Sequence, residues 1–156
     1  MSPAFFRSGS FPDVQPVTDN KRFYLLSFTW GLLMNLAGMA AAAVMLLTGH
    51  RPKRFGPCVY FEHGDGWGGM SWGMFFIVCR GADERLLAHE LGHGMQNCRF
   101  GPFMPFLVGI PSSLRYHARR IFTRINGKEP RTPYDAAWFE GQATAVGTEY
   151  IKMTAV

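Results

Sequence analysis

The sequence predicts an α+β fold that begins with a transmembrane helix. This prediction rests on three features: an uninterrupted apolar run at residues 23–48, β-prone segments around a glycine-rich centre at residues 59–79, and helix signals that begin at Asp83 and Asp135. A chain of 156 residues has room for about one domain. The expected organisation is an irregular tail at residues 1–22, a transmembrane helix at residues 23–48 and a small domain at residues 55–156.

The apolar run FYLLSFTWGLLMNLAGMAAAAVMLLT is longer than the roughly 20 residues that cross a hydrocarbon core. It is also about twice as long as the apolar part of a signal peptide, which favours a single-pass span over a cleaved leader. Gly38 and Ala42 stand four positions apart and could seat another helix, although a plain lipid-facing anchor is the simpler interpretation. The basic residues near the two ends are balanced, so the positive-inside rule sets no orientation: Arg7, Lys21 and Arg22 on one side, and Arg51, Lys53 and Arg54 on the other.

The composition narrows the choice of partners and compartment. Charged residues make up 17% of the chain, below the usual level of about 25%, and the formal net charge is +5. No nucleic-acid motif accompanies this charge, so we expect membrane lipid and no nucleic acid as a partner. Cys58, Cys79 and Cys98 are odd in number and form no CxxC pair, which favours free thiols and a reducing, cytoplasmic side.

The glycine-rich centre lies between two β-prone runs and predicts a hairpin or a pair of short strands. Gly64, Gly66 and Gly69 match the letters of a dinucleotide-binding loop. Such a loop must open a helix, whereas this one leads into the β-rich run MFFIVC. We therefore interpret it as a turn.

Asp83 is a suitable N-cap for a helix that should stop at Gly101-Pro102. The following stretch at residues 100–114 is apolar but contains three prolines, which predicts a buried or interfacial loop. A last helix is predicted from Asp135, which we expect to act as its N-cap.

The segment LLAHELGHGMQN contains the motif H-E-x-x-H. On a helix, His89 and His93 share one face and can bind one metal ion, while Glu90 lies about 100 degrees around the axis, beside the ion. This offset suits a general base that activates water on Zn²⁺. Gly92 and Gly94 each cost a helix about 1 kcal/mol relative to alanine, which makes sense where another backbone must come close.

A catalytic zinc site needs a third protein ligand. Glu140 is the best candidate, because Ala136, Ala143 and Gly147 lie on its own helix face and would let two helices approach closely. His117 and Glu149 are weaker candidates, since one has basic surroundings and the other lies near the end of the chain.

Four segments within residues 66–147 form a wider pattern: GWGGMSWGMFFIV, LLAHELGHGMQN, FGPFMPFLVGIPSSL and YDAAWFEGQATAVG. This pattern resembles a family of small bacterial membrane proteins with a gluzincin-type zinc metallopeptidase core, which also occurs in Rhs-type toxin proteins. The resemblance implies an inner-membrane location and a minimal gluzincin-like core. Within it, His89, His93 and Glu140 would bind the metal, Glu90 would be the base and Gln96 would lie near the site. The segment MSWGMFFIV would supply a strand beside the cleft, where an extended peptide could pair.

These features together predict a membrane-anchored zinc metalloprotease acting on peptide or protein substrates. A membrane scaffold with a structural zinc ion and a zinc hydrolase of a non-peptide amide remain alternatives. A structural site normally fills four positions with protein groups, whereas here three ligands are evident and Glu90 is spare, which favours catalysis. Tyr134 and His117 are candidates for stabilising an oxyanion. The substrate, the side of the membrane and the oligomeric state are left open.

Overall fold

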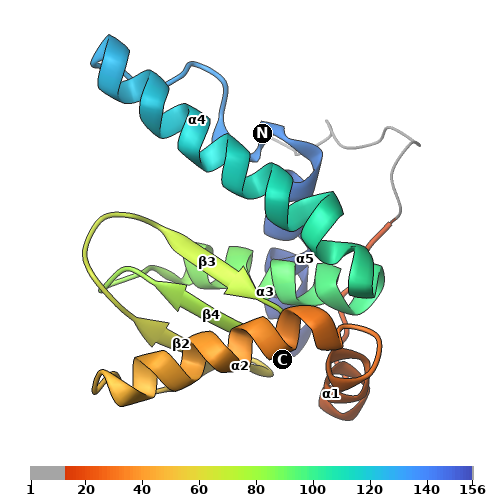
Figure 1. The fold of residues 1–156 in the computed structure, drawn as a ribbon. Coiled ribbons are helices and arrows are strands. Elements are labelled where there is room, and N and C mark those ends of the chain that lie inside the picture. Colours follow the sequence, from red (N-terminus) through yellow and green to blue (C-terminus); the bar gives the residue numbers. More distant parts are fainter. Residues whose placement is uncertain (1–12, 156) are drawn as a thin grey trace.

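Helices cover both faces of a small mixed sheet in the computed structural model, which describes residues 13–155 (Figure 1). This confirms the predicted α+β class. Residues 13–19 are irregular, whereas residues 20–22 of the predicted tail belong to α1. The part of that tail up to residue 12 lies outside the described residues. The helices are α1 (Asn20–Phe28), α2 (Leu32–Leu47), α3 (Glu84–Phe100), α4 (Ile110–Asn126) and α5 (Trp138–Thr154).

The sheet has the order β1-β2-β4-β3, formed by β1 (Lys53–Phe55), β2 (Cys58–Glu62), β3 (Gly69–Trp72) and β4 (Phe75–Val78). The two β-prone runs around the glycine-rich centre become β2 and β4 and pair in parallel, so they do not form a hairpin with each other. The hairpin is formed by β4 and β3, which comes from the glycine-rich centre itself, and Gly73 takes a φ of 63° in its turn. β2 pairs with β4 in parallel, in a register that places Tyr60 beside Phe76. β3 therefore lies at an edge of the sheet, and among residues 13–155 no other strand pairs with its outer side.

Each face of the sheet packs against different helices because side chains alternate along a strand. Phe76 and Val78 belong to the main hydrophobic core, which they share with residues of α3 such as Leu91. Phe61 belongs to a second cluster on the other face, formed with Ala42 and Met45 of α2. The sheet is thus the middle layer of three, with α2 on one side and α3 and α5 on the other.

The apolar run at residues 23–48 does not form the single continuous helix that the sequence predicted. α1 and α2 meet at 94° around the break between Phe28 and Leu32. Buried amide side chains satisfy backbone groups there: Asn35 donates to the carbonyl of Ser27, and Asn97 donates to the carbonyl of Gly31. Asn35 also accepts a hydrogen bond from the backbone of Met74, so the break is fixed by the hairpin and by α3.

Within the described chain, no helix taken alone has both the length and the apolar character needed to cross a bilayer. α1 and α2 meet those criteria only as a bent pair. One side of α2 is buried against the protein, including Asn35, Gly38 and Ala42. A Cβ on Gly38 would stand 2.4 Å from the carbonyl oxygen of Trp72, so this glycine seats the helix on the sheet hairpin.

The loop predicted at residues 100–114 is helical in the structure. It consists of a 3-10 turn at Gly101–Phe103, a π-helical segment at Pro105–Gly109 and the first turn of α4. Each piece has a proline at its first or second position, where the fixed φ of proline suits a helix. This is why three prolines did not prevent helix formation. α3 ends at Phe100, as predicted.

Candidate metal centre

Helix α3 carries the H-E-x-x-H motif through the interior of the protein. Its N-cap is Asp83, as predicted, and the side chain accepts a hydrogen bond of 2.8 Å from the backbone of Leu86. Most residues of α3 from Ala88 onward are buried, including Glu90 and His93. The motif therefore lies on the part of α3 that is mostly buried.

Glycines let α3 and α5 approach until their backbones touch. A Cβ on Gly92 would stand 1.9 Å from the carbonyl oxygen of Ala143, and a Cβ on Gly147 would stand 1.8 Å from that of Ala88. The expected close approach is thus confirmed from both helices. Gly94 faces the turn of the β3–β4 hairpin. A Cβ on Gly94 would stand 3.1 Å from the carbonyl oxygen of Gly73.

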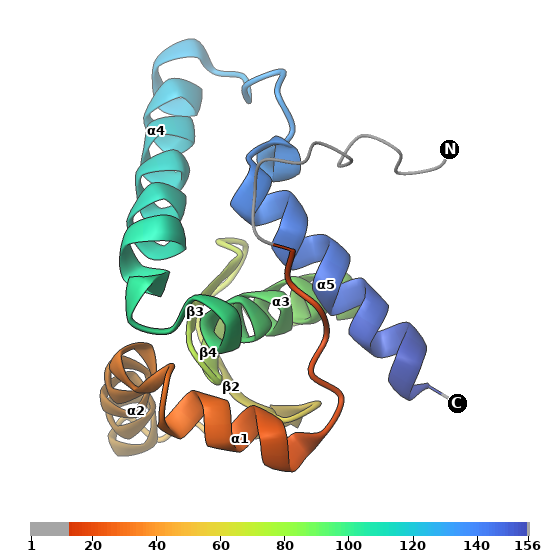
Figure 2. The same cartoon turned by 90° about the vertical axis from the view of Figure 1, so that its right-hand side faces the viewer.

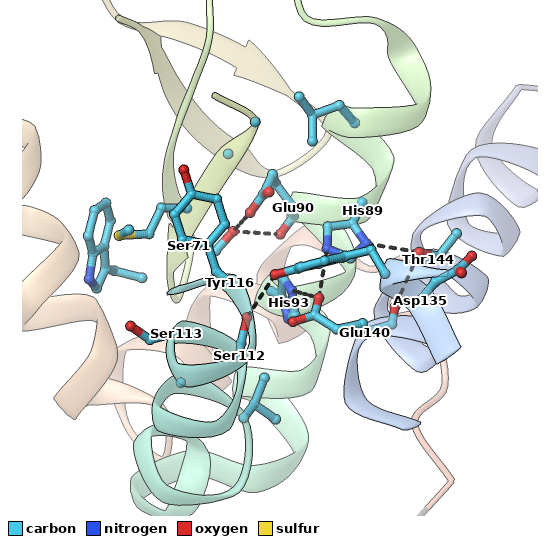
Figure 3. Close-up of a pocket in the computed structure, with 18 of the residues that line it drawn as sticks. Ser71, His89, Glu90, His93, Ser112, Ser113, Tyr116, Asp135, Glu140 and Thr144 are labelled. Carbon is cyan, nitrogen blue, oxygen red and sulfur yellow. Dashed lines mark hydrogen bonds and ion pairs between the residues drawn. The ribbon is translucent and has the colours of Figure 1, made fainter. Parts of the chain in front are cut away.

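This close packing brings the side chains of His89, His93 and Glu140 together (Figure 3). The Nε2 atoms of His89 and His93 lie 3.1 Å and 3.3 Å from Oε2 of Glu140. One ligand atom from each residue lies within 4.8 Å of the other two, so the group could hold a metal ion. Glu140 is fully buried.

Both imidazoles are oriented by partners on their other ring nitrogen. Nδ1 of His93 lies 2.8 Å from Oε1 of Gln96, whose amide nitrogen donates to the carbonyl of Phe139. Nδ1 of His89 lies 2.8 Å from the hydroxyl of Thr144, which donates to the carbonyl of Glu140. Each Nδ1 is therefore the donor, and each Nε2 faces the carboxylate. Partners of this kind are what fix metal-binding imidazoles.

The carboxylate of Glu140 needs a positive partner. Neither of its oxygens has a well-aligned hydrogen bond among the described residues, although both are buried. Burial favours the neutral acid, yet the facing imidazoles of His89 and His93 hold the pKa of Glu140 well below its usual range. Burial likewise opposes charge on His93, but Glu140 outweighs it and raises the pKa of that imidazole. A buried anion that meets two imidazole nitrogens without aligned hydrogen bonds fits a bound cation.

Glu90 lies in the same pocket but outside this three-residue group. Its carboxylate accepts a short hydrogen bond from the hydroxyl of Ser71 on β3, which holds it beside the histidines (Figure 3). A Cβ on Gly69 would stand 2.3 Å from Oε1 of Glu90, so this glycine of the edge strand makes room for the carboxylate. Glu90 is buried, and its carboxylate is not part of the group that could hold a metal ion.

A pocket of about 1050 Å³ opens onto these residues. Tyr134 lines it, with its ring centroid 6.4 Å from that of His89 and its hydroxyl 3.5 Å from the hydroxyl of Ser112 on α4. Burial and the nearby carboxylate of Glu140 raise the pKa of Tyr134 to about 12, so its phenol stays protonated at neutral pH. Arg115 on α4 donates to the backbone carbonyls of Pro133 and Tyr134 and fixes this segment.

The other sequence candidates lie away from the metal group. His117 and Glu149 are exposed, and neither lines the pocket. Asp135 is not an N-cap: it lies in a 3-10 turn at Tyr134–Ala136, and α5 begins after Ala137 without a side-chain cap. Ala136 therefore precedes α5 and does not belong to its small-residue face. The three cysteines are free, and two of them, Cys58 and Cys98, are buried.

The sequence did not predict the contact of Ser71 with Glu90 or that of Thr144 with His89. Thr144 stands one turn after Glu140, a spacing that places both on one helix face. Ser71 carried no signal, because its contact with Glu90 depends on how the hairpin packs against α3.

Comparisons with family models, curated proteins and solved structures found no match to this chain. A functional proposal for this chain must therefore rest on the geometry of the site.

Proposed function

We propose that this chain is a membrane-attached zinc metalloprotease with a minimal gluzincin-like core. The observation that carries the proposal is the convergence of His89, His93 and Glu140, within 4.8 Å, beside a separate buried carboxylate in an open pocket. Zinc binds imidazole and carboxylate ligands and leaves one position open at catalytic sites. Glu90 is the group that distinguishes a catalytic from a purely structural site.

A zinc ion held by His89, His93 and Glu140 would act as a Lewis acid and supply a water nucleophile at neutral pH. In this proposal, Glu90 takes the proton from the attacking water and returns it to the leaving amine. Ser71 holds Glu90 in place through its hydroxyl. Tyr134, protonated at neutral pH, donates a hydrogen bond to the substrate oxygen that becomes negatively charged.

A peptide is the proposed substrate because the site borders a strand edge that no other strand of the described chain pairs with. β3 is the last strand of the sheet, and Gly69 and Ser71 on it contact Glu90. An extended peptide that added to this edge would pass the metal group, and its backbone would supply the pairing. Apolar pocket residues such as Met34, Met70 and Val108 favour apolar substrate side chains.

The alternatives differ in what they leave unexplained. A scaffold with a structural zinc ion does not account for the pocket or for the Ser71–Glu90 pair. Hydrolysis of a non-peptide amide would use the same residues but makes no use of the free edge of β3. We therefore favour the protease.

Replacement of Glu90 by Gln tests the proposal. We expect Glu90→Gln to retain stoichiometric zinc, because the metal group is intact, and to lower hydrolysis of a peptide library by about a hundredfold or more. Glu84→Gln is the matched control, since Glu84 is an exposed glutamate on the same helix. Elemental analysis that finds no zinc in the purified chain, or a Glu90→Gln variant that cleaves at the parental rate, would refute the proposal.

A further inference from the structure

Helix α4 has an exposed apolar stripe. Ile110, Leu114, Ile121 and Ile125 follow one another at offsets of four, seven and four residues, which places them on one face of a helix. All four are exposed, and Ile125 is 77% exposed. α4 has no buried residue along its whole length. Its apolar face is thus not used by the fold.

The same helix is strongly basic. It contains four arginines and no aspartate or glutamate. Arg115 and Arg119 donate to backbone carbonyls of the segment before α5. By helical spacing, Arg120 and Arg124 lie along one side of the apolar stripe. An arginine-rich face next to an apolar stripe is typical of helices that lie in the interface of an anionic membrane.

A second exposed apolar surface lies on the same side of the molecule. The outer side of α2 exposes Leu32, Leu33, Leu36, Val44 and Leu47. α2 and α4 together form one side of the protein, on the left in Figure 2, and α5 forms the opposite side. The connection between α3 and α4 adds Phe103, Phe106 and Leu107, which are also exposed.

The pocket lies between these two helices. Leu33 of α2 and Ile110 of α4 both line it, and each is 51% exposed. They therefore stand at the rim of the pocket.

We propose that α4 and the outer side of α2 form one surface that binds an anionic phospholipid bilayer, with the pocket mouth facing the lipid. Because the inner side of α2 is buried against the sheet, the bent pair would lie in the membrane interface and not cross it. A second copy of the chain is a poorer occupant, since it would bring another arginine-rich helix with no acidic residues to this one. The proposal rests on the membrane attachment in the proposed function and not on the protease activity.

Vesicle flotation of the full-length chain tests this surface. We expect the protein to float with vesicles of phosphatidylcholine and phosphatidylglycerol, and less with phosphatidylcholine alone. Replacing Ile121 and Ile125 together by Asp should lower the partition coefficient on anionic vesicles by about tenfold or more. Met153→Asp is the matched control, because Met153 is an exposed apolar residue on α5, on the opposite side. It should bind as the parent does.

Equal flotation of the double variant and the parent would overturn the proposal, as would equal binding to neutral and anionic vesicles. A parent that forms a dimer without binding vesicles, and a double variant that is monomeric, would show self-association instead. Glu90→Gln should float like the parent, because Glu90 is buried in the pocket. Normal flotation by a chain that holds no zinc would refute the protease while leaving this surface in place.

Discussion

Nδ1 of His93 lies 2.8 Å from Oε1 of Gln96, one turn further along α3. The amide nitrogen of Gln96 is held in turn by the carbonyl of Phe139, next to Glu140. Gln96 thereby connects one candidate metal ligand to the start of the helix that carries another.

Gln96→Leu should lower metal affinity by about 10- to 100-fold, because His93 loses the partner that orients its ring. Competition with a chromophoric chelator measures this affinity, and circular dichroism checks that the variant is folded. Gln96→Glu keeps an acceptor oxygen and should lose less affinity. An unchanged affinity in Gln96→Leu would mean that packing alone orients His93.

Glu140→Ala should remove the stabilisation that metal confers. An ion bound only by the native state raises the free energy of unfolding, so the parent should unfold at a higher temperature with added Zn²⁺. The variant should show little such shift and low metal occupancy. His117→Ala and Glu149→Ala change exposed residues outside the pocket and should behave like the parent. Stoichiometric, chelator-resistant metal in Glu140→Ala would rule out Glu140 as the third ligand.

Gly147→Ala should destabilise the fold by about 1–3 kcal/mol or more, because its Cβ would meet the backbone of Ala88 at 1.8 Å. Urea unfolding measures the change. Gly109→Ala is the control, since the nearest atom to its Cβ would be 3.8 Å away, an ordinary contact. Equal stability of Gly147→Ala and the parent would show that α3 and α5 are further apart than described.

Tyr134→Phe removes a hydroxyl and keeps the ring. If Tyr134 stabilises the developing oxyanion, kcat should fall by about a hundredfold or more while zinc content and KM stay close to the parental values. Tyr24→Phe, on α1 and outside the pocket, serves as the control. A variant with parental kcat would exclude this role, and one with lower zinc content would point to a structural role instead.

The sequence by itself predicted the features that depend on local spacing. The H-E-x-x-H motif placed two imidazoles on one helix face, Asp83 capped that helix, and the glycine at position 92 indicated a close backbone contact. Glu140 could be selected because small residues were expected on its helix face. Ala143 and Gly147 lie on α5, whereas Ala136 precedes it. All of these signals lie within a few turns of one chain segment, where helical periodicity alone decides which side chains are neighbours.

The tertiary structure decided what depends on distant contacts. The composition of residues 23–48 predicts one helix. In the structure the run is broken, and the side-chain amides of Asn35 and Asn97 donate to backbone carbonyls at the break. Asn35 is held by the backbone of Met74 in the hairpin, and Asn97 lies on α3. The parallel pairing of β2 with β4 and the contact of Ser71 with Glu90 likewise join segments that carry no local signal for each other. Buried polar groups must find partners wherever the fold brings them, so their partners cannot be read from spacing along the chain.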